Sequence, residues 1–308
     1  MKRLRNRATT WLSALVFLAG GAWGYFSADG PGAQIVFLDI GQGDATFIRS
    51  PEGRTVLIDG GRSQGRLLDL LEELGLEAGT DTLDLIIASH ADFDHIGGLV
   101  AAAEEFPARN FMDNTVVHDT LAYENLLEAV DQAGSRLLEP TRRSINLGSL
   151  RLEILPPPLT TRDQNTNSIG VVVHHGSFTV LIAGDATHST QTYWRANYPN
   201  ALTSIEVYRS AHHGSDTGDS VDFLQFIAPE VVVVSVGEGN PYGHPEAEAL
   251  ASYNAVTNQV FRTDEVGHVA VASAGNGQFG YDLATGQLEV TPTVDVFAVV
   301  ENVLSAFR

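Results

Sequence analysis

The chain has 308 residues, of which 44% are hydrophobic, and this length and composition predict a globular protein with a sizeable core. Its 38 acidic and 18 basic residues give a formal net charge of −20 at pH 7. This acidity argues against nucleic-acid binding through a broad positive surface, and the absence of cysteine excludes thiol catalysis, disulfides and cysteine-ligated zinc.

Residues 1–28 have the features of an export segment. A basic start, Met1–Arg7, precedes an uncharged apolar run from Trp11 to Phe26, which is typical of a signal peptide or an N-terminal membrane anchor. The bulky Phe26 disfavours cleavage, so we favour the anchor. Residues 29–33 predict a linker. We therefore expect an exported protein, periplasmic or extracellular, which is anchored in the inner membrane if the segment is retained.

The body begins with short strands separated by turns that contain glycine or proline. The expected strands are Ala33–Ile40, Ala45–Arg49 and Arg54–Asp59, and they predict an antiparallel meander. Leucines at helical spacing then predict a helix over residues 65–76.

The next segment concentrates side chains that bind metals. The apolar run Asp84–Ala88 predicts a buried strand, and Ser89–Gly98 follows it directly before a helix at 97–103. The ligand-type residues of this motif are His90, Asp92, Asp94 and His95. Imidazole nitrogen together with carboxylate oxygen suits zinc, manganese or iron, so the motif predicts a metal site just past a strand end.

The rest of the body alternates strands and helices. We expect strands at 150–155, 169–174, 178–183, 205–209, 231–236, 259–262 and 269–273. We expect helices at 120–133, 187–195, 221–227 and 245–255, and an amphipathic C-terminal helix within 291–308. Two sheets packed face to face with helices outside satisfy this order, so residues 34–290 predict one α/β domain, a four-layer αββα sandwich.

Three later strands also end in residues of ligand or catalytic type. They lead to Asp185, to Ser210–Ser215 with its pair His212 and His213, and to Tyr242–Pro245. Each of these segments alone is typical of a turn or a surface histidine. Because strand ends at one sheet edge converge in space, the segments together predict a single shared site.

In combination these motifs resemble the metallo-β-lactamase fold, and within it the extracellular hydrolase domain of ComEC-type competence proteins. The matching segments are Leu38–Ala45, Leu57–Gly61, Ser89–Gly98, Asn167–Ser168, Ala183–Asp185, Ala211–Ser215, Asn240 with Tyr242–Pro245, and Arg262–Asp264. No segment matches the membrane channel or the DNA-binding module of full-length ComEC proteins, so we expect a free-standing hydrolase.

The resemblance implies a site for one or two divalent metal ions, zinc or manganese. The implied ligands are His90 and Asp92 for one ion, Asp94 and His95 for a second, Asp185 between them, and His213. Asp94 would also accept a proton, and His212 and His244 would contact the substrate or move protons. The implied supporting residues are Asp59, Asn167, Ser168 and Ser210.

Two departures from the pattern bear on this site. The usual third-motif histidine is missing, and Asn167 and Ser168 stand near its place, which predicts that one ion binds more weakly than the other. The segment His174–Ser177 has the same residue types as His212–Ser215. It lies at an expected hairpin, so we interpret it as having no role in the site.

The favoured function is a phosphodiesterase that uses metal-activated water, most simply a nuclease linked to DNA uptake or to degradation of extracellular DNA. Its partner would be a phosphodiester substrate such as DNA, with membrane contact through the N-terminal segment and no stable protein partner. The arginines available for a small basic cleft are Arg142, Arg143, Arg162 and Arg209.

Two alternatives stay open. One is a phosphorylcholine-esterase-like hydrolase of cell-surface polymers, which would need aromatic rings around a quaternary ammonium. The candidate rings are Tyr193, Trp194, Tyr198 and Tyr242. The other is a non-catalytic binding subunit of the envelope. β-Lactam hydrolysis is disfavoured, because Asp92 and the missing histidine depart from the pattern of true lactamases.

Overall fold

The computed structural model describes residues 32–284 of the chain. The expected export segment, most of the expected linker, the C-terminal helix and the last few residues of the expected domain lie outside this range. Within residues 32–284, no helix is both long enough and apolar enough to cross a bilayer.

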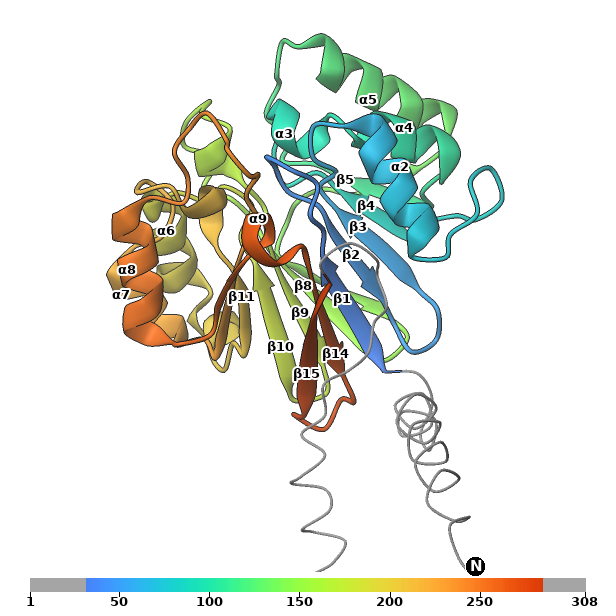
Figure 1. The fold of residues 1–308 in the computed structure, drawn as a ribbon. Helices are drawn as coiled ribbons and strands as arrows, with labels where there is room; N and C mark the ends of the chain where they lie inside the picture. Colours follow the sequence, from blue (N-terminus) through green and yellow to red (C-terminus); the bar gives the residue numbers. More distant parts are fainter. Residues whose placement is uncertain (1–31, 285–308) are drawn as a thin grey trace, which may run out of the picture.

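Two β-sheets pack face to face at the centre of the molecule (Figure 1). In the described residues the first sheet has eight strands in the order β15-β14-β1-β2-β3-β4-β5-β6. The bounds are β1 Ala33–Phe37, β2 Thr46–Arg49, β3 Thr55–Ile58, β4 Leu85–Ile87, β5 Asn110–Met112, β6 Arg136–Leu137, β14 His268–Ser273 and β15 Phe279–Ala284. The antiparallel pairing of β1, β2 and β3 confirms the predicted meander, whereas β3 to β6 run parallel.

The second sheet has seven strands in the described residues, in the order β13-β12-β11-β10-β9-β8-β7. The bounds are β7 Arg143–Leu147, β8 Leu150–Leu155, β9 Gly170–His175, β10 Phe178–Ile182, β11 Val207–Arg209, β12 Val231–Val234 and β13 Val260–Arg262. β7 to β10 are antiparallel and β10 to β13 are parallel. The carboxyl ends of β10, β11 and β12 therefore meet at one edge.

Helices cover the outer face of each sheet (Figure 1). The first sheet carries α2 Gln64–Glu73, α3 Phe93–Ile96, α4 Leu99–Glu105 and α5 Leu121–Gln132, and the second carries α6 His188–Asn197, α7 Val221–Ile227 and α8 Ala247–Val256. Shorter helical segments are η1 Asn165–Asn167, η2 Pro199–Leu202, η3 Ala211–Gly214 and α9 Thr263–Val266. The predicted αββα sandwich is confirmed.

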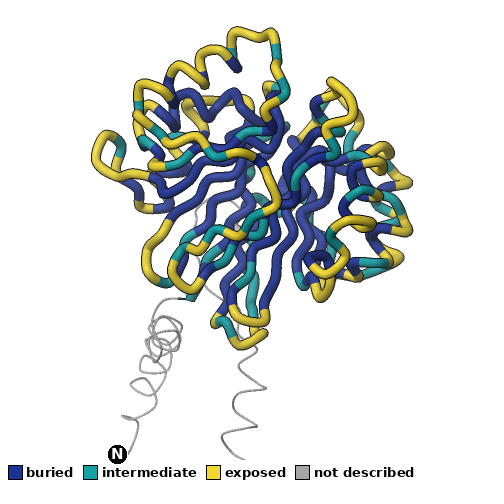
Figure 2. Tube along the Cα trace, turned by 180° about the vertical axis from the view of Figure 1, so that it is seen from behind, coloured by how far each residue is buried: buried dark blue, intermediate teal, exposed yellow. Residues whose placement is uncertain are grey.

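Strand alternation supplies the core with side chains on both faces. In β9, Val171 and Val173 pack between the two sheets, while Val172 packs against the helices of the second sheet. Both faces of the sheets are thus covered, which explains why their strands are apolar runs. Figure 2 shows the buried residues along the central strands and the exposed residues on the outer helices and loops.

Some element boundaries predicted from the sequence were wrong. The strand expected to reach Ile40 ends at Phe37, because the amide of Ile40 donates back to the carbonyl of Leu38 and the chain turns into a loop. The edge strand β15 was not expected. It pairs antiparallel along its whole length with β14, the strand directly before it in the chain, so the two form a hairpin at the edge of the sheet.

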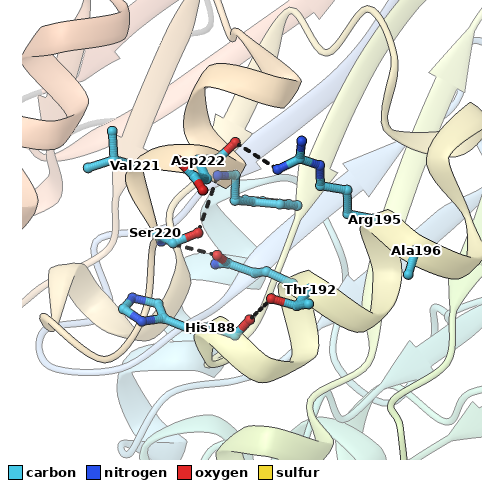
Figure 3. Close-up of a pocket in the computed structure, with 9 residues that line it drawn as sticks. His188, Thr192, Arg195, Ala196, Ser220, Val221 and Asp222 are labelled. Carbon is cyan, nitrogen blue, oxygen red and sulfur yellow. Dashed lines mark hydrogen bonds between the residues drawn. The ribbon is translucent and has the colours of Figure 1, made fainter.

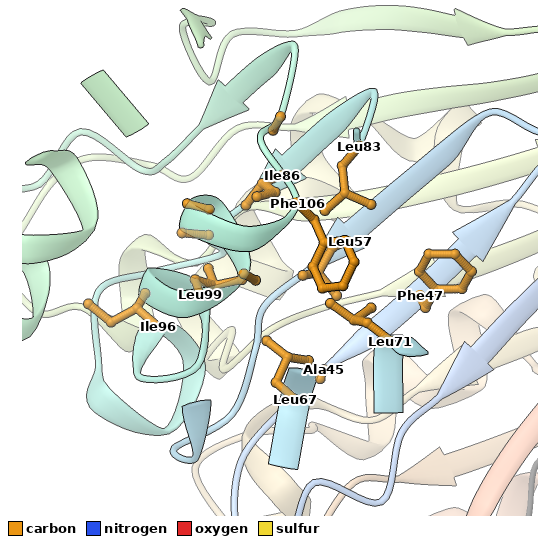
Figure 4. Close-up of a cluster of buried hydrophobic side chains, with 14 of the residues drawn as sticks. Ala45, Phe47, Leu57, Leu67, Leu71, Leu83, Ile86, Ile96, Leu99 and Phe106 are labelled. Carbon is orange, nitrogen blue, oxygen red and sulfur yellow. The ribbon is translucent and has the colours of Figure 1, made fainter. Parts of the chain in front are cut away.

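We expect Phe106→Ala to lower the free energy of unfolding by about 3–5 kcal/mol, because Phe106 is fully buried among Leu57, Leu71 and Leu83 in the cluster under the helices (Figure 4). Chemical denaturation would measure the loss. Leu121→Ala is the control, since Leu121 is 71% exposed and its truncation should change stability by less than about 0.5 kcal/mol. Equal effects of the two changes would contradict this view of the core.

Candidate metal centre

The site lies where parallel strands from both sheets end. Asp59 follows β3 and Ser89 with His90 follows β4 in the first sheet, while Asp185 follows β10 and His213 lies beyond β11 in the second. The loop after β4 contains α3, which marks this edge of the molecule in Figure 1. The site is therefore built jointly by the two sheets.

Three buried imidazoles converge on one carboxylate. The Nε2 atom of His95 lies 3.2 Å from Oδ1 of Asp185, and the Nε2 atoms of His213 and His90 lie 3.5 Å and 3.9 Å from its Oδ2. All four residues are at most 3% exposed. The sequence had assigned these four to the site, and the structure brings them together.

The opposite ring nitrogen of each histidine is occupied by an acceptor. Nδ1 of His95 lies 2.9 Å from Oδ2 of Asp59, and Nδ1 of His213 lies 2.9 Å from the carbonyl of Ser235. Nδ1 of His90 lies 3.1 Å from Oγ of Ser89. These acceptors place the ring proton on Nδ1 and leave the Nε2 lone pairs facing Asp185, which is the tautomer that binds a metal.

Asp59 controls two of these histidines at once. Its carboxylate accepts from His95, from the Ser89 amide at 2.7 Å and from the Ser89 hydroxyl at 2.7 Å. Because the Ser89 proton is committed to Asp59, the Ser89 oxygen can accept from His90. Asp59 itself has the left-handed backbone angle φ 58°, which a non-glycine residue adopts at a cost.

The donor set fits a divalent cation. Within residues 32–284, Nε2 of His90, His95 and His213 and Oδ1 of Asp185 are buried without a hydrogen-bond partner. Such orphaned atoms are rare unless an unseen group satisfies them. Burial lowers the pKa of His95, but the carboxylates of Asp185 and Asp59 outweigh it and raise that pKa well above its usual value. The pocket therefore favours a positive charge beside Asp185.

Two further acidic ligand candidates lie on the open side of this pocket. Asp92 places Oδ2 3.5 Å from Nε2 of His90, and Asp94 places Oδ2 3.7 Å from Nε2 of His213. Their side chains are 37% and 20% exposed. Both are thus placed to complete a coordination shell from the solvent side.

His212 and His244 lie beside the pocket rather than inside it. Nε2 of His212 is 3.7 Å from Oδ2 of Asp185 and 3.3 Å from Nδ2 of Asn165, and its ring centroid is 5.8 Å from that of His244. His212 and His213 have φ 52° and 53°, so the backbone bends sharply to turn the two rings apart. Burial first, and then the nearby His212 and His213, lower the pKa of His244.

The other expected supporting residues differ in their contacts. The hydroxyl of Ser168 lies 3.4 Å from Nδ1 of His90 and accepts from the Asp185 amide at 3.1 Å, so it touches two residues of the pocket. The amide group of Asn167 instead donates to the carbonyls of Thr161 and Asp163, which holds a loop. Ser210 is fully buried at the end of β11, where its amide donates to the carbonyl of Val233.

Sequence reasoning missed Asp44. It is buried on the loop between β1 and β2, and Asp44, His95, Asp185 and His213 each offer a ligand atom within 4.8 Å of one another. Asp44, however, approaches Nδ1 of His95 at 3.7 Å and Nδ1 of His213 at 3.9 Å. It therefore lies behind the two imidazoles. The signal for it was the glycine turn Gly41–Gly43 inside the opening motif.

Asp44 forms an ion pair with Arg209, an arginine that we had predicted to lie at the surface. Arg209 was expected in a surface cleft for DNA, but it is fully buried and forms an ion pair with Asp44. It also donates to the carbonyl of Gly184 at 2.7 Å. This part of the basic-cleft prediction was wrong, because β11 directs Arg209 inward to balance the carboxylates of the site.

The other residues proposed for the substrate are dispersed. Arg142 pairs with Glu153 and lies over the ring of Tyr198, at the edge of the second sheet. Trp194 is fully buried and donates to the carbonyl of Pro156, so it cannot form an exposed aromatic cage. Of the four aromatic candidates, Tyr242 is the one in contact with the site histidines, through His244.

A separate cavity of about 600 Å³ lies between α6 and α7 (Figure 3). Its polar groups bond to each other: Arg195 donates to the carbonyl of Asp222, and Thr192 donates to the carbonyl of His188. None of the site residues expected from the sequence lines it.

The segment His174–Ser177 has the same residue types as His212–Ser215 but lies at the β9–β10 hairpin. There the His174 ring contacts Glu153 and the His175 ring contacts Ser273.

This geometry agrees with the sequence comparison. Residues 38–238 match the Metallo-beta-lactamase superfamily, and the chain belongs to that family. It is a metallo-β-lactamase-fold hydrolase related to ComEC-like competence proteins, so the predicted resemblance is confirmed.

Two relatives show the extent of that relation. The chain is 25% identical over 286 residues to ComE operon protein 3 of Bacillus subtilis, covering 87% of this chain and 36% of that protein. It is 30% identical over 244 residues to Recombination protein 2 of Haemophilus influenzae, covering 78% of this chain and 29% of that protein. This chain thus spans about a third of their length.

Among solved structures, the metallo-beta-lactamase fold protein YhfI of Bacillus subtilis aligns with a TM-score of 0.49 at 12% identity. The alignment covers 75% of this chain and 95% of that chain. A similarity this distant has no bearing on substrate.

We expect Asp59→Asn to weaken manganese binding by about 10- to 100-fold, because an amide cannot accept from His95 and Ser89 in the same way and the imidazoles lose their orientation. Calorimetric titration of the metal-free protein would measure this. Asp84→Asn is the matched control, since Asp84 is also buried but bonds to Arg54 and Thr55. An Asp59→Asn protein with wild-type affinity would refute the role assigned to Asp59.

The buried Asp44–Arg209 pair predicts strong coupling in a double-mutant cycle. Asp44→Asn or Arg209→Gln alone should each cost about 3–5 kcal/mol of stability, because the remaining charge is buried without its partner, and the double variant should cost less than their sum. Denaturation of the metal-free proteins measures this. The pair Arg54–Asp84, in which Arg54 is 48% exposed, should show coupling of at most about 1 kcal/mol.

Proposed function

We propose that this protein is a metal-dependent phosphodiesterase, most simply a nuclease acting on DNA. The observation that carries the proposal is the convergence of three buried Nε2 atoms on Asp185, each with its Nδ1 atom already engaged. A protein that used these histidines only for packing would satisfy both nitrogens.

The residues would divide the work as follows. His90 with Asp92 would hold one ion and His95 with Asp94 a second; Asp185 lies between these pairs and His213 adds a further ligand. When bound, a divalent ion lowers the pKa of water and polarises a phosphoryl oxygen. Zinc and manganese both suit this mixture of imidazole and carboxylate.

The open side of the pocket supplies the groups that would act on the substrate. Asp94 is partly exposed and would accept a proton from the attacking water. His212 and His244 form a short row of rings from Asp185 towards solvent, and they would contact the substrate or carry the proton to the leaving oxygen.

The site of action proposed is outside the cytoplasm, in the periplasm or extracellular space. The basic and apolar residues 1–28 support export, and the competence proteins among the relatives support an association with DNA uptake at the envelope. The phosphorylcholine-esterase alternative loses support, because Trp194 is fully buried and Tyr193 and Tyr198 pack against each other on and beside α6.

The test is turnover of bis-p-nitrophenyl phosphate and plasmid DNA by the full chain with manganese or zinc. We expect activity that EDTA abolishes and that Asp94→Ala lowers by at least about 100-fold, because the variant loses both a ligand and the proposed proton acceptor. The control variant is Asp131→Ala, on the exposed face of α5, which should leave the activity unchanged.

Two other outcomes of these assays would support a different function. Hydrolysis of p-nitrophenyl phosphorylcholine without cleavage of DNA would support the esterase. A protein that neither retains metal nor turns over any of these compounds would support a non-catalytic binding subunit.

A further inference from the structure

A continuous series of contacts, drawn from both halves of the chain, runs beside the metal centre. We call the residues involved the aromatic rim: they are Phe93, Arg62, Tyr242, His244 and His212. The side chain of Arg62 lies over the Phe93 ring, 5.5 Å from its centroid, and donates to the hydroxyl of Tyr242 at 3.2 Å. The Tyr242 ring then stacks on His244, with centroids 5.9 Å apart and an interplanar angle of 14°.

The rim is joined to the metal centre at both ends. Phe93 lies between Asp92 and Asp94 in the chain, so its position is tied to two of the proposed ligands. At the other end, His244 lies against His212, which is 3.7 Å from Asp185. A ligand whose phosphate reached the pocket would therefore contact the rim.

Two rim side chains are exposed in a way that packing does not explain. Phe93 is 50% exposed and Tyr242 is 54% exposed. The other exposed large hydrophobic side chains within residues 32–284 are all aliphatic. Exposed aromatic rings at a binding site supply large contact area at low entropic cost.

The charge of the protein restricts how it could hold a polyanion. Beyond the first seven residues the chain carries 14 of its 18 basic residues against all 38 acidic ones, a net charge of −24. That charge disfavours binding through many phosphate contacts. Base stacking needs no positive surface, since every base has a π-face.

Arg62 decides between the two substrate classes that an aromatic site suggests. A quaternary ammonium needs aromatic rings without a competing positive charge, but the Arg62 guanidinium lies over the Phe93 ring and donates to the Tyr242 hydroxyl, so it stands beside both rings. The same guanidinium would attract a phosphate beside a stacked base.

We propose that the aromatic rim binds single-stranded DNA, with bases stacked on Phe93 and Tyr242 and a neighbouring phosphate held by Arg62. This inference rests on the proposed phosphodiesterase function and names its substrate as a nucleotide strand rather than a choline ester. Phe93, Tyr242 and Arg62 would set affinity and specificity without acting on the reacting atoms.

The test is fluorescence anisotropy of a labelled oligothymidylate of about 12 nucleotides with the full chain, in EDTA and with manganese. We expect Phe93→Ala and Tyr242→Ala each to weaken binding about tenfold or more, while Tyr242→Phe retains most of it. An abasic oligonucleotide of the same length should bind weakly, and equally, to the wild type and both alanine variants.

Arg62→Ala should weaken oligonucleotide binding, whereas Arg195→Ala should not. Arg195 is the matched control because it lies over Phe226 in the same way, 4.8 Å from the ring centroid, beside the cavity of α6 and α7. In cleavage assays the rim variants should raise KM more than they lower kcat.

Three results would overturn the proposal: no oligothymidylate binding by the wild type, equal binding by the rim alanine variants, or displacement of the oligonucleotide by phosphorylcholine at concentrations where thymidine 5′-phosphate fails. The proposed function is judged separately, by hydrolysis of bis-p-nitrophenyl phosphate. If the wild type hydrolyses this ester but the rim variants bind the oligonucleotide as well as the wild type does, the rim proposal alone is rejected. If the wild type does not hydrolyse it, the proposed phosphodiesterase function is rejected.

Discussion

The hydrogen bonds that Asp59 accepts are the constraint on which the rest of the site depends. This one buried carboxylate accepts a hydrogen bond directly from His95 and is linked to His90 through the Ser89 hydroxyl. The tautomers of two proposed ligands therefore follow from a single side chain. The left-handed backbone of Asp59 is the cost of that arrangement. Because Asp59 follows β3 and Ser89 follows β4, the parallel pairing of those two strands sets the positions of both imidazoles.

The second sheet supplies the complementary half. Asp185 and His213 follow β10 and β11, and Arg209 reaches from β11 to Asp44 on the first half, so a buried ion pair joins the two halves directly behind the imidazoles. Such a pair adds little net stability compared with apolar packing, but loss of either member is costly. Its benefit is therefore placement: it ties the relative position of the sheets to the geometry of the metal pocket.

The acidity of the chain and its proposed substrate are reconciled by the same geometry. A strongly negative body repels DNA at long range, and salt screens that repulsion over about 10 Å or less. Attraction then has to come from contacts at the mouth itself. The aromatic rim offers stacking surface and one cation, Arg62, at the point where a phosphodiester would enter the proposed metal centre.

The sequence by itself determined the fold class and the dense ligand motif, because apolar runs of strand length and a cluster such as His90 to His95 are local properties of the chain. It also indicated Asp185 and the pair His212 and His213, since both follow shortly after a strand. Only the tertiary structure decided the roles of Asp44, Arg209 and Arg62. An arginine looks the same in a sequence whether its strand points it into the core, as in Arg209, or its loop leaves it at the mouth, as in Arg62. The pairs Arg209 with Asp44 and Arg62 with Tyr242 join residues more than a hundred positions apart, and no local pattern encodes such contacts.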